Sequence, residues 1–320
     1  MTLIKVTGVS KKADDTFILK DIAFSQRKSQ RISIAGETGS GKTTLLKIMA
    51  GLVQPDEGEI FFQNKKVSGP AENLVPGHPR IAYLSQNFEL PKFLRVEQVL
   101  TYASAVPKKQ TDQLYRVCQI DHLLKRKTDQ LSGGEKQRIA IARLLIALPR
   151  LLLLDEPFSH LDMPHKNTLK AVIKDITEKL KITCILVSHD PADTLSWADH
   201  ILVMRDGMIV QQGTPGEIYN QPVNEYVAGL FGKYFPLTKN KTRLTAFPKR
   251  AHVNGTKKFL RPEDFKIVKE NARAIKGRVM NVNFYGSYYE VDVAIGKDII
   301  TVKSDDNQLK EGTSVFISLT

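Results

Sequence analysis

The sequence predicts an α/β fold with a parallel sheet, followed by a small all-β domain. Short apolar runs of β type alternate with helical patterns through about Phe231, as in α/β domains. A glycine-rich loop separates the run at 31–35 from the helical pattern that follows it. Beyond residue 259 short strand-like runs dominate, with glycine between them. The β-type runs of the first part are residues 31–35, 80–84, 151–154 and 183–187.

Turn and alternation signals define the later elements. Asp206 and Gly207 stand between apolar runs at 201–204 and 208–212, and an Asp-Gly pair in that place predicts a β-hairpin. Residues 289–293 read Tyr-Glu-Val-Asp-Val, the apolar and polar alternation of a half-buried strand. We therefore expect a small OB-like β-domain at the end of the chain.

Composition excludes several classes of protein. The chain is 42% hydrophobic and 25% charged, which is ordinary for a globular protein. Apolar stretches at 144–148 and 151–154 are shorter than the roughly 20 residues that a membrane span needs. Residues 1–12 have no apolar core, so no secretory signal is expected. Cys118 and Cys184 lie far apart in apolar surroundings, so we expect core thiols in a reducing compartment.

The formal net charge of +13 is compatible with three kinds of anionic partner: nucleic acid, an anionic membrane leaflet and a polyphosphate ligand. A single-strand binder would interleave its basic runs with stacking aromatic residues, and the sequence lacks such a pattern. We interpret most of the charge as surface lysines that keep the protein soluble. No nucleic-acid partner is expected.

The glycine-rich loop matches the phosphate-binding pattern G-x-x-x-x-G-K-[ST]. Glycines allow backbone N–H groups to wrap phosphate oxygens, the lysine reaches the β- and γ-phosphates, and the threonine places a hydroxyl on Mg²⁺. The following helix directs the positive end of its dipole at the anion. The loop therefore predicts a site for a nucleoside triphosphate with Mg²⁺. Its residues are Gly36, Glu37, Thr38, Gly39, Ser40, Gly41, Lys42 and Thr43, with Thr44 next in the chain.

A pair of acids follows the apolar run at 151–154. Such a strand delivers Asp155 to its carboxyl end, where the carboxylate can hold Mg²⁺ through water. Glu156, one residue later, is placed to polarise an attacking water as general base. Two acids in this position can also cap a helix. The phosphate-binding loop makes the catalytic interpretation the stronger one.

Between these two motifs lies Leu-Ser-Gly-Gly-Glu-Lys-Gln-Arg at residues 131–138, which resembles the signature of ABC ATPases. Other motifs of that family follow in its order. Gln86 is similar to the Q-loop glutamine, residues 159–162 to the D-loop, and His189 to the switch histidine. The resemblance covers residues 1 to about 235.

The resemblance implies an ATPase that binds ATP and Mg²⁺ and works as a head-to-tail homodimer with two ATP molecules between the chains. It implies that Ser132, Gly133 and Gly134 contact the γ-phosphate bound by the opposite subunit, the helix end supplying roughly +0.5 charge. His189 would contact the γ-phosphate and orient both the water and Glu156. Gln86 would sense Mg²⁺ and that water beside the membrane partner. Asp162 of the D-loop would also contact nucleotide.

One position departs from the family pattern. Members usually carry an aromatic residue that stacks on adenine, and alignment places Ala13 there. Phe17 is the nearest substitute, with ordinary strand packing as the alternative. Stacking on a base would contribute about 1–3 kcal/mol.

The last part of the chain resembles a TOBE domain, on the strength of Phe-Leu-Arg-Pro-Glu-Asp at 259–264 and the strands that follow. TOBE domains end the ATPases of importers for polyamines, iron(III), sugars, sulfate or molybdate. The alternative is a β-module that only clamps a dimer. Residues 236–261 hold eight Lys or Arg and no acid, which we interpret as a solvated connector rather than a membrane contact. The expected parts are an ATP-binding domain at 1–235 with a helical subdomain at about 87–133, a basic linker at 236–258 and a TOBE-like domain at 259–320.

The resemblance also implies partners. A coupling helix of a membrane permease would dock beside residues 86–94, where Phe88, Leu90, Phe93 and Leu94 have subdomain packing as their alternative role. An extracytoplasmic substrate-binding protein would act through that permease, with this chain peripheral on the cytoplasmic face of the membrane. The permease and binding protein would choose the substrate.

Three rival functions remain at this point. A soluble ABC ATPase of DNA repair or translation usually carries a long coiled coil, zinc cysteines or two fused cassettes, and the sequence shows none of these. An exporter ATPase is disfavoured by the TOBE-like tail. A non-enzymatic ATP-binding switch is disfavoured by Glu156 and His189.

Overall fold

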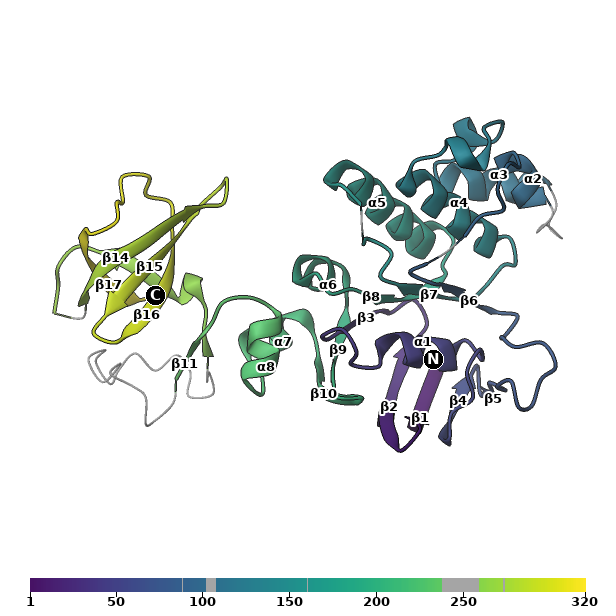
Figure 1. Cartoon of the computed structure of the whole chain (residues 1–320), viewed down its shortest axis with the longest axis horizontal. Helices are drawn as coiled ribbons and strands as arrows, with labels where there is room; N and C mark the ends of the chain where they lie inside the picture. The colour runs from purple at the N-terminus through teal and green to yellow at the C-terminus, as the bar shows by residue number, and fades with distance from the viewer. Residues whose placement is uncertain (88, 102–107, 160, 238–258, 273) are drawn as a thin grey trace. The chain divides into compact units, whose positions relative to one another are not determined.

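The computed structural model describes the chain except for residues 88, 102–107, 160, 238–258 and 273 (Figure 1). The chain divides into two compact units, Met1–Pro215 and Gly216–Thr320. Along the described parts of both units, no helix is long and apolar enough to cross a membrane. Cys118 and Cys184 are buried free thiols, as expected.

The first unit is built on a six-stranded sheet in the order β10-β9-β3-β8-β7-β6. All neighbours in it are parallel except β9 and β10, the hairpin expected at Asp206 and Gly207. The loops after the central strands therefore meet at one carboxyl edge of the sheet. The strands are β3 (Arg31–Ala35), β6 (Ile81–Leu84), β7 (Leu151–Asp155), β8 (Thr183–Val187), β9 (His200–Arg205) and β10 (Met208–Gly213).

A second, antiparallel sheet in the order β2-β1-β4-β5 lies on one side of this core. Helix α1 (Lys42–Met49) lies between the two sheets (Figure 1), and its Leu45 and Leu46 are fully buried among strand residues of both. This burial anchors the helix that begins directly after the phosphate-binding loop. The strands are β1 (Thr2–Ala13), β2 (Thr16–Arg27), β4 (Glu57–Phe62) and β5 (Lys65–Lys66).

Two helices with well-defined starts lie on the opposite side of the parallel sheet (Figure 1). Helix α4 (Gly133–Leu145) begins at a capping box, in which Ser132 Oγ accepts from the Glu135 N–H and Glu135 Oε2 accepts from the Ser132 N–H. Helix α5 (Met163–Lys179) begins after Asp162, whose carboxylate accepts from the backbone N–H of His165. The shorter elements are α2 (Val96–Thr101), α3 (Lys108–Val117), α6 (Pro191–Trp197) and the 3₁₀ turns Asp121–Leu123 and Thr128–Gln130.

The second unit is a five-stranded antiparallel sheet in the order β13-β17-β14-β15-β16, preceded by two short helices. Its core alternates along the strands as expected, with Val291 and Val293 buried on β15. The helices are α7 (Pro215–Asn220) and α8 (Glu225–Leu230). The strands are β11 (Phe235–Pro236), β12 (Phe259–Leu260), β13 (Phe265–Val268), β14 (Ile275–Phe284), β15 (Tyr289–Ile295), β16 (Asp298–Ser304) and β17 (Ser314–Leu319), with a 3₁₀ turn at Pro262–Asp264.

The division between the units falls earlier than the boundary expected near residue 235. Arg261 is buried, and its guanidinium donates to the carbonyls of Tyr219, Ala228, Gly232 and Lys233. A buried cation must be fully hydrogen-bonded, and here the carbonyls of the helical segment satisfy it. Residues 216–235 therefore belong with the β-domain by their contacts. Of the expected linker at 236–258, all but residues 236 and 237 lies outside the described part of the chain.

Candidate active site

The phosphate-binding loop connects β3 to α1 and passes very close to two other strands. A Cβ built on Gly36 would stand 2.3 Å from the carbonyl oxygen of Met204 in β9. A Cβ on Gly41 would stand 2.7 Å from the carbonyl oxygen of Ile18 in β2, and Gly41 has a φ of 94°. Side chains are excluded at both positions, so the glycines of the motif are required by packing as well as by phosphate approach.

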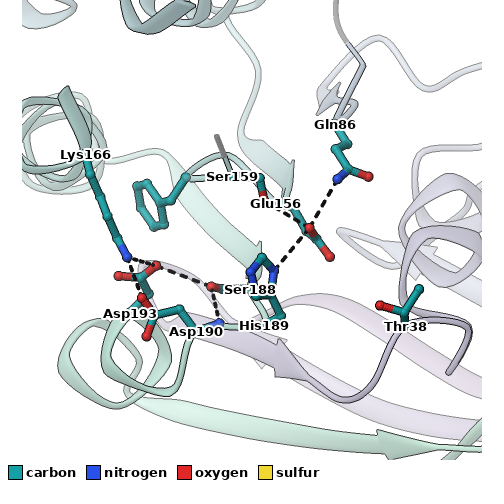
Figure 2. A pocket seen from close by; sticks show the side chains of 10 residues that line it. Thr38, Gln86, Glu156, Ser159, Lys166, Ser188, His189, Asp190 and Asp193 are labelled. Carbon is teal, nitrogen blue, oxygen red and sulfur yellow. Dashed lines mark hydrogen bonds and ion pairs between the residues drawn. The ribbon is translucent and has the colours of Figure 1, made fainter. Parts of the chain in front are cut away.

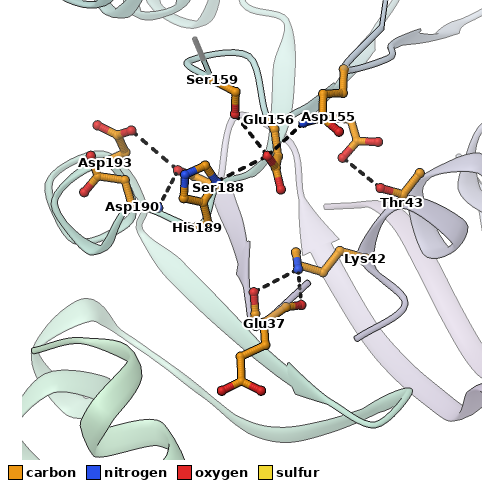
Figure 3. A network of polar contacts seen from close by, with 12 residues as sticks. Glu37, Lys42, Thr43, Asp155, Glu156, Ser159, Ser188, His189, Asp190 and Asp193 are labelled. Carbon is orange, nitrogen blue, oxygen red and sulfur yellow. Dashed lines mark hydrogen bonds and ion pairs between the residues drawn. The ribbon is translucent and has the colours of Figure 1, made fainter. Parts of the chain in front are cut away.

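Lys42 is held inside this loop (Figure 3). It is only 6% exposed, and its Nζ donates to the carbonyl oxygens of Gly36 at 2.8 Å and Glu37 at 2.6 Å. Burial lowers the pKa of Lys42, while the charges of Glu156 and Asp155 act in the opposite direction. The ammonium group is thus placed at the centre of the loop, where the motif predicts that it meets phosphate.

Asp155 lies at the carboxyl end of β7 between two hydroxyl donors. Thr43 Oγ1 donates to its Oδ1 at 3.2 Å, and Tyr83 of the neighbouring strand donates to its Oδ2 at 2.9 Å. Burial raises the pKa of Asp155, although these two hydrogen bonds oppose the shift. Tyr83 was not among the predicted site residues, and its only signal in the sequence is a single phenol in an otherwise apolar strand.

Thr43 and Asp155 fit Mg²⁺ by their chemistry. A hydroxyl and a carboxylate are oxygen ligands, and Mg²⁺ is usually held by one or two carboxylates together with phosphates and water. Within the described ranges, no group of three or more His, Cys, Asp or Glu is arranged to hold a metal alone. Gln86, the third expected metal contact, directs its Nε2 at Glu156, and its Oε1 is the atom that could reach a metal.

Three side chains converge on one oxygen of Glu156 (Figure 2). Its Oε2 lies 3.3 Å from Gln86 Nε2, 3.0 Å from Ser159 Oγ and 3.2 Å from His189 Nδ1. These groups come from the loops after β6, β7 and β8, which meet at the sheet edge as the topology requires. Glu156 itself has a φ of 47°, a conformation that costs on the order of 1 kcal/mol or more and is found at functional sites.

A pocket of about 370 Å³ opens beside this carboxylate (Figure 2). It joins the phosphate-binding loop, through Thr38, to the predicted residues Gln86, Glu156 and His189. The other lining residues were not predicted individually as site residues: Phe158, Ser159, Lys166, Ser188, Asp190 and Asp193.

The signature residues lie elsewhere in the same chain. Ser132, Gly133 and Gly134 form the start of α4, and none of the three lines this pocket. Asp162 caps α5, and His165 holds its pKa below the usual range through its backbone N–H and its ring. His160 of the D-loop falls outside the described residues.

Phe17 lies on β2 one residue before Ile18, which touches the phosphate-binding loop at Gly41. Its side chain is 39% exposed, so it is not a core residue of the sheet. The ammonium group of Lys12 stands 4.6 Å from the centre of its ring. Ala13, the position where the family usually has an aromatic residue, pairs with Thr16 at the end of the β1–β2 hairpin.

A second pocket, of about 360 Å³, lies between the segment after β6 and α4. Asn87 and Glu89 line one side of it, with Arg143 and Leu144 of α4 on the other. Of the apolar residues expected in this segment, Phe93 is 72% exposed, Leu90 and Leu94 are half-buried, and Phe88 lies outside the described residues. Subdomain packing therefore does not account for Phe93.

The comparisons with known proteins agree with this geometry. Residues 19–159 match the family model of the ABC transporter, and residues 259–320 match that of the TOBE domain. The chain is 32% identical to the spermidine/putrescine import ATP-binding protein PotA of Clostridium acetobutylicum, over 99% of this chain and 94% of that relative. It is also 32% identical to the sulfate/thiosulfate import ATP-binding protein CysA of a Synechocystis species, over 98% of this chain and 92% of the relative.

Solved structures show the same cassette fold. The cbiO1 protein of Clostridium perfringens, part of the ABC transporter complex cbiONQ, aligns with a TM-score of 0.62 and 28% identity over 68% of this chain and 90% of that one. The ATP-binding cassette MJ0796, solved as a dimer with ADP and Pi, aligns with a TM-score of 0.57 and 25% identity over 67% of this chain and 99% of that one. The expected α/β fold with a terminal β-domain is confirmed. The chain belongs to the ABC transporter family, as an ATP-binding ATPase subunit that carries a TOBE domain.

Proposed function

We propose that this chain cleaves ATP with Glu156 as general base and uses that reaction to drive solute import through a separate membrane permease. The observation that carries the catalytic part is the convergence of Gln86, Ser159 and His189 on Glu156 Oε2, beside the loop that holds Lys42. A carboxylate fixed from three sides keeps its orientation, which general-base catalysis requires.

Each residue then has a defined task in the proposed reaction. The loop amides and Lys42 bind the phosphates, and Thr43 and Asp155 hold Mg²⁺, which when bound neutralises charge on the phosphate oxygens. Glu156 accepts a proton from water as that water attacks the γ-phosphorus, and the bond to the leaving ADP oxygen breaks. His189 and Gln86 keep the glutamate and the water aligned. The products are ADP and inorganic phosphate.

The site is completed, in this proposal, by a second copy of the chain in a head-to-tail homodimer. Ser132, Gly133 and Gly134 open α4 away from the lining of their own pocket, so they are free to meet the γ-phosphate bound by the partner. Asp162 would approach the same nucleotide from the D-loop. The cassette MJ0796 was solved as a dimer, which supports an assembly of two chains.

The second pocket is the proposed docking place for a permease coupling helix. Glu89 and Arg143 provide charges of both signs around it, and exposed Phe93 provides an apolar contact nearby in sequence. The chain would then work peripherally on the cytoplasmic face of the membrane, with an extracytoplasmic binding protein supplying the solute. The names of the relatives indicate a polyamine or a sulfur oxyanion as substrate.

Two measurements test the proposal. Glu156→Gln should leave ATP affinity within about two-fold and reduce turnover by roughly 10²-fold or more, while Glu178→Gln, at an exposed site on α5, should behave as the wild type. Normal turnover in Glu156→Gln would mean that another group is the base. Vesicles holding the copurified permease should take up labelled spermidine or sulfate only with ATP inside, and uptake without this chain would contradict the importer role.

A further inference from the structure

The segment that carries His189 is tied to helix α5 by a cluster of charged residues. Lys166 of α5 forms ion pairs with Asp190 and, at 2.9 Å, with Oδ2 of Asp193 (Figure 2). Lys170, one turn later, pairs with Oδ1 of Asp193 at 2.6 Å. The side chain of Asp193 is only 1% exposed, so the negative charge of its buried carboxylate depends on these two lysines for neutralisation.

His189 has little support of its own. Its side chain is 63% exposed, and the contact that places it in the site is the one with Glu156. Its position is therefore set by the residues on either side of it. Ser188 is buried, its Oγ accepts from the N–H of Asp190 at 3.1 Å, and Asp190 Oδ1 caps α6 at the N–H of Ala192.

These contacts make residues 188–193 a closed local network whose ionic link to α5 is made by Lys166 and Lys170. Lys166 differs from Lys170 because it alone of the two pairs with Asp190, the residue next to His189. It also lies in the first turn of α5, where its N–H donates to the carbonyl of Asp162 at 2.9 Å. One lysine thus connects the D-loop end of α5 to the histidine segment (Figure 3 shows the latter).

We propose that Lys166 is a positioning residue for catalysis, which keeps His189 aligned on Glu156 by holding Asp190 and Asp193. Because Lys166 lies in the first turn of α5, it also fixes the segment of His189 relative to Asp162, the residue that caps the same helix. This inference rests on the proposed roles of Glu156 and His189. Lys166 lines the same pocket as Thr38 of the phosphate-binding loop but on the opposite side of it, with its ammonium group directed at Asp190 and Asp193 (Figure 2). Its loss should therefore affect turnover and leave nucleotide binding nearly unchanged.

The kinetic test compares Lys166→Met with Lys166→Arg and with Lys179→Met, whose lysine pairs with Asp175 on the exposed face of α5. We expect Lys166→Met to lower kcat by about 10-fold or more, with ATP affinity within about two-fold, because small misplacements of catalytic groups are costly. Lys166→Arg should restore most of the rate, and Lys179→Met should match the wild type. In a His189→Ala background, Lys166→Met should cost less than about two-fold, because both changes then remove the same alignment.

An equal loss of kcat on Lys166→Met in the wild-type and His189→Ala backgrounds would overturn the inference, as would an unchanged kcat in Lys166→Met.

A second readout does not depend on activity: the imidazole NMR signals of the ¹⁵N-histidine-labelled full chain, in which the signal of His189 is assigned by its loss in His189→Ala. The signal of His189 should shift or broaden in Lys166→Met and return to its wild-type position in Lys166→Arg. An unchanged signal in Lys166→Met would refute the positioning role of Lys166. If Lys166→Met does not fold, Asp190→Asn, which keeps the capping oxygen and removes the charge, replaces it. Wild-type turnover in His189→Ala would refute the proposed catalytic role of His189. The histidine signal would still decide whether Lys166 positions His189.

Discussion

The imidazole ring of His165 lies against Gly134 at the start of the signature helix. A Cβ built on Gly134 would stand 2.9 Å from Cδ2 of His165, closer than Cβ atoms come to other atoms in proteins, and 3.1 Å from Cβ of His165, which is also a tight contact. The same ring contacts Asp162 Oδ1 through Nδ1 at 2.5 Å. One histidine thus spaces the starts of α4 and α5, the two segments proposed to face the partner chain.

This contact predicts that Gly134→Ala is destabilising. The added methyl group must displace the His165 ring or α4 itself, at a cost of about 1–3 kcal/mol. Thermal unfolding should show a lowered midpoint, and His165→Ala in the same chain should restore it. Gly133→Ala is the matched control for stability, because a Cβ there would meet nothing within 4 Å. If both alanine variants melted alike, the contact between His165 and Gly134 would have no energetic role.

Truncation tests where the ATPase unit ends. A chain ending at Pro215 should fold and bind ATP, because the core around α1 and the parallel sheet lies wholly before that residue. A chain ending at Lys233 should also bind ATP, but it leaves the carbonyls of Ala228 and Gly232 without the guanidinium of Arg261. It should bind more of a hydrophobic dye such as ANS than the chain ending at Pro215, which lacks the apolar residues Ile218, Val227 and Phe231. Equal dye binding, or a failure of the shorter chain to fold, would place the boundary later than Pro215.

The parts of the site that could be predicted are those in which chemistry dictates residue type at a fixed spacing. The phosphate-binding loop, the acids Asp155 and Glu156 at the end of β7, and His189 after β8 lie at one sheet edge because parallel strands share that edge. The hairpin at Asp206 and Gly207 followed from local turn chemistry alone.

What could not be predicted depends on contacts between segments far apart in the sequence. Lys166 of α5 and Asp193 of α6 form an ion pair although they lie far apart in the sequence, and neither residue belongs to a recognisable spacing. The compact units divide at 215, earlier than the predicted domain boundary near 235, and Arg261 contributes by reaching back to carbonyls of residues 219–233. The resemblance identified Gln86 as a site residue and placed Ser159 only in the D-loop. Their common target, one oxygen of Glu156, depends on three loop conformations together and was not predicted.

Base binding provides a test of Phe17. If its exposed ring stacks on adenine, Phe17→Ala should weaken ATP binding by about 1–3 kcal/mol, and Phe17→Tyr should change it little. Ala13→Tyr, which adds an aromatic residue at the usual family position, should recover part of the affinity in the Phe17→Ala chain. Equilibrium binding of ATP by calorimetry checks all three. Unchanged affinity in Phe17→Ala would leave Phe17 as a strand residue without a ligand role.

The two-chain site makes the most demanding prediction, because it separates binding from turnover. One sheet edge of a single chain carries Lys42, Thr43, Asp155, Glu156 and His189. Ser132, in contrast, starts α4 outside the pocket beside Glu156. A single chain should therefore bind ATP and hydrolyse it poorly, and activity per chain should rise with protein concentration before levelling off.

Ser132→Arg places a bulky cation where a small hydroxyl must meet the partner's γ-phosphate. It should leave ATP affinity of the monomer within a few-fold and nearly abolish both the ATP-driven dimer and turnover. Lys42→Ala should instead weaken binding in the monomer, because Lys42 lies in the cradle of its own chain. ATP affinity and turnover of both variants, measured across a protein concentration series, decide between the arrangements. Activity independent of concentration, or a Ser132→Arg monomer unable to bind ATP, would place the signature in the same chain's site and exclude the head-to-tail dimer.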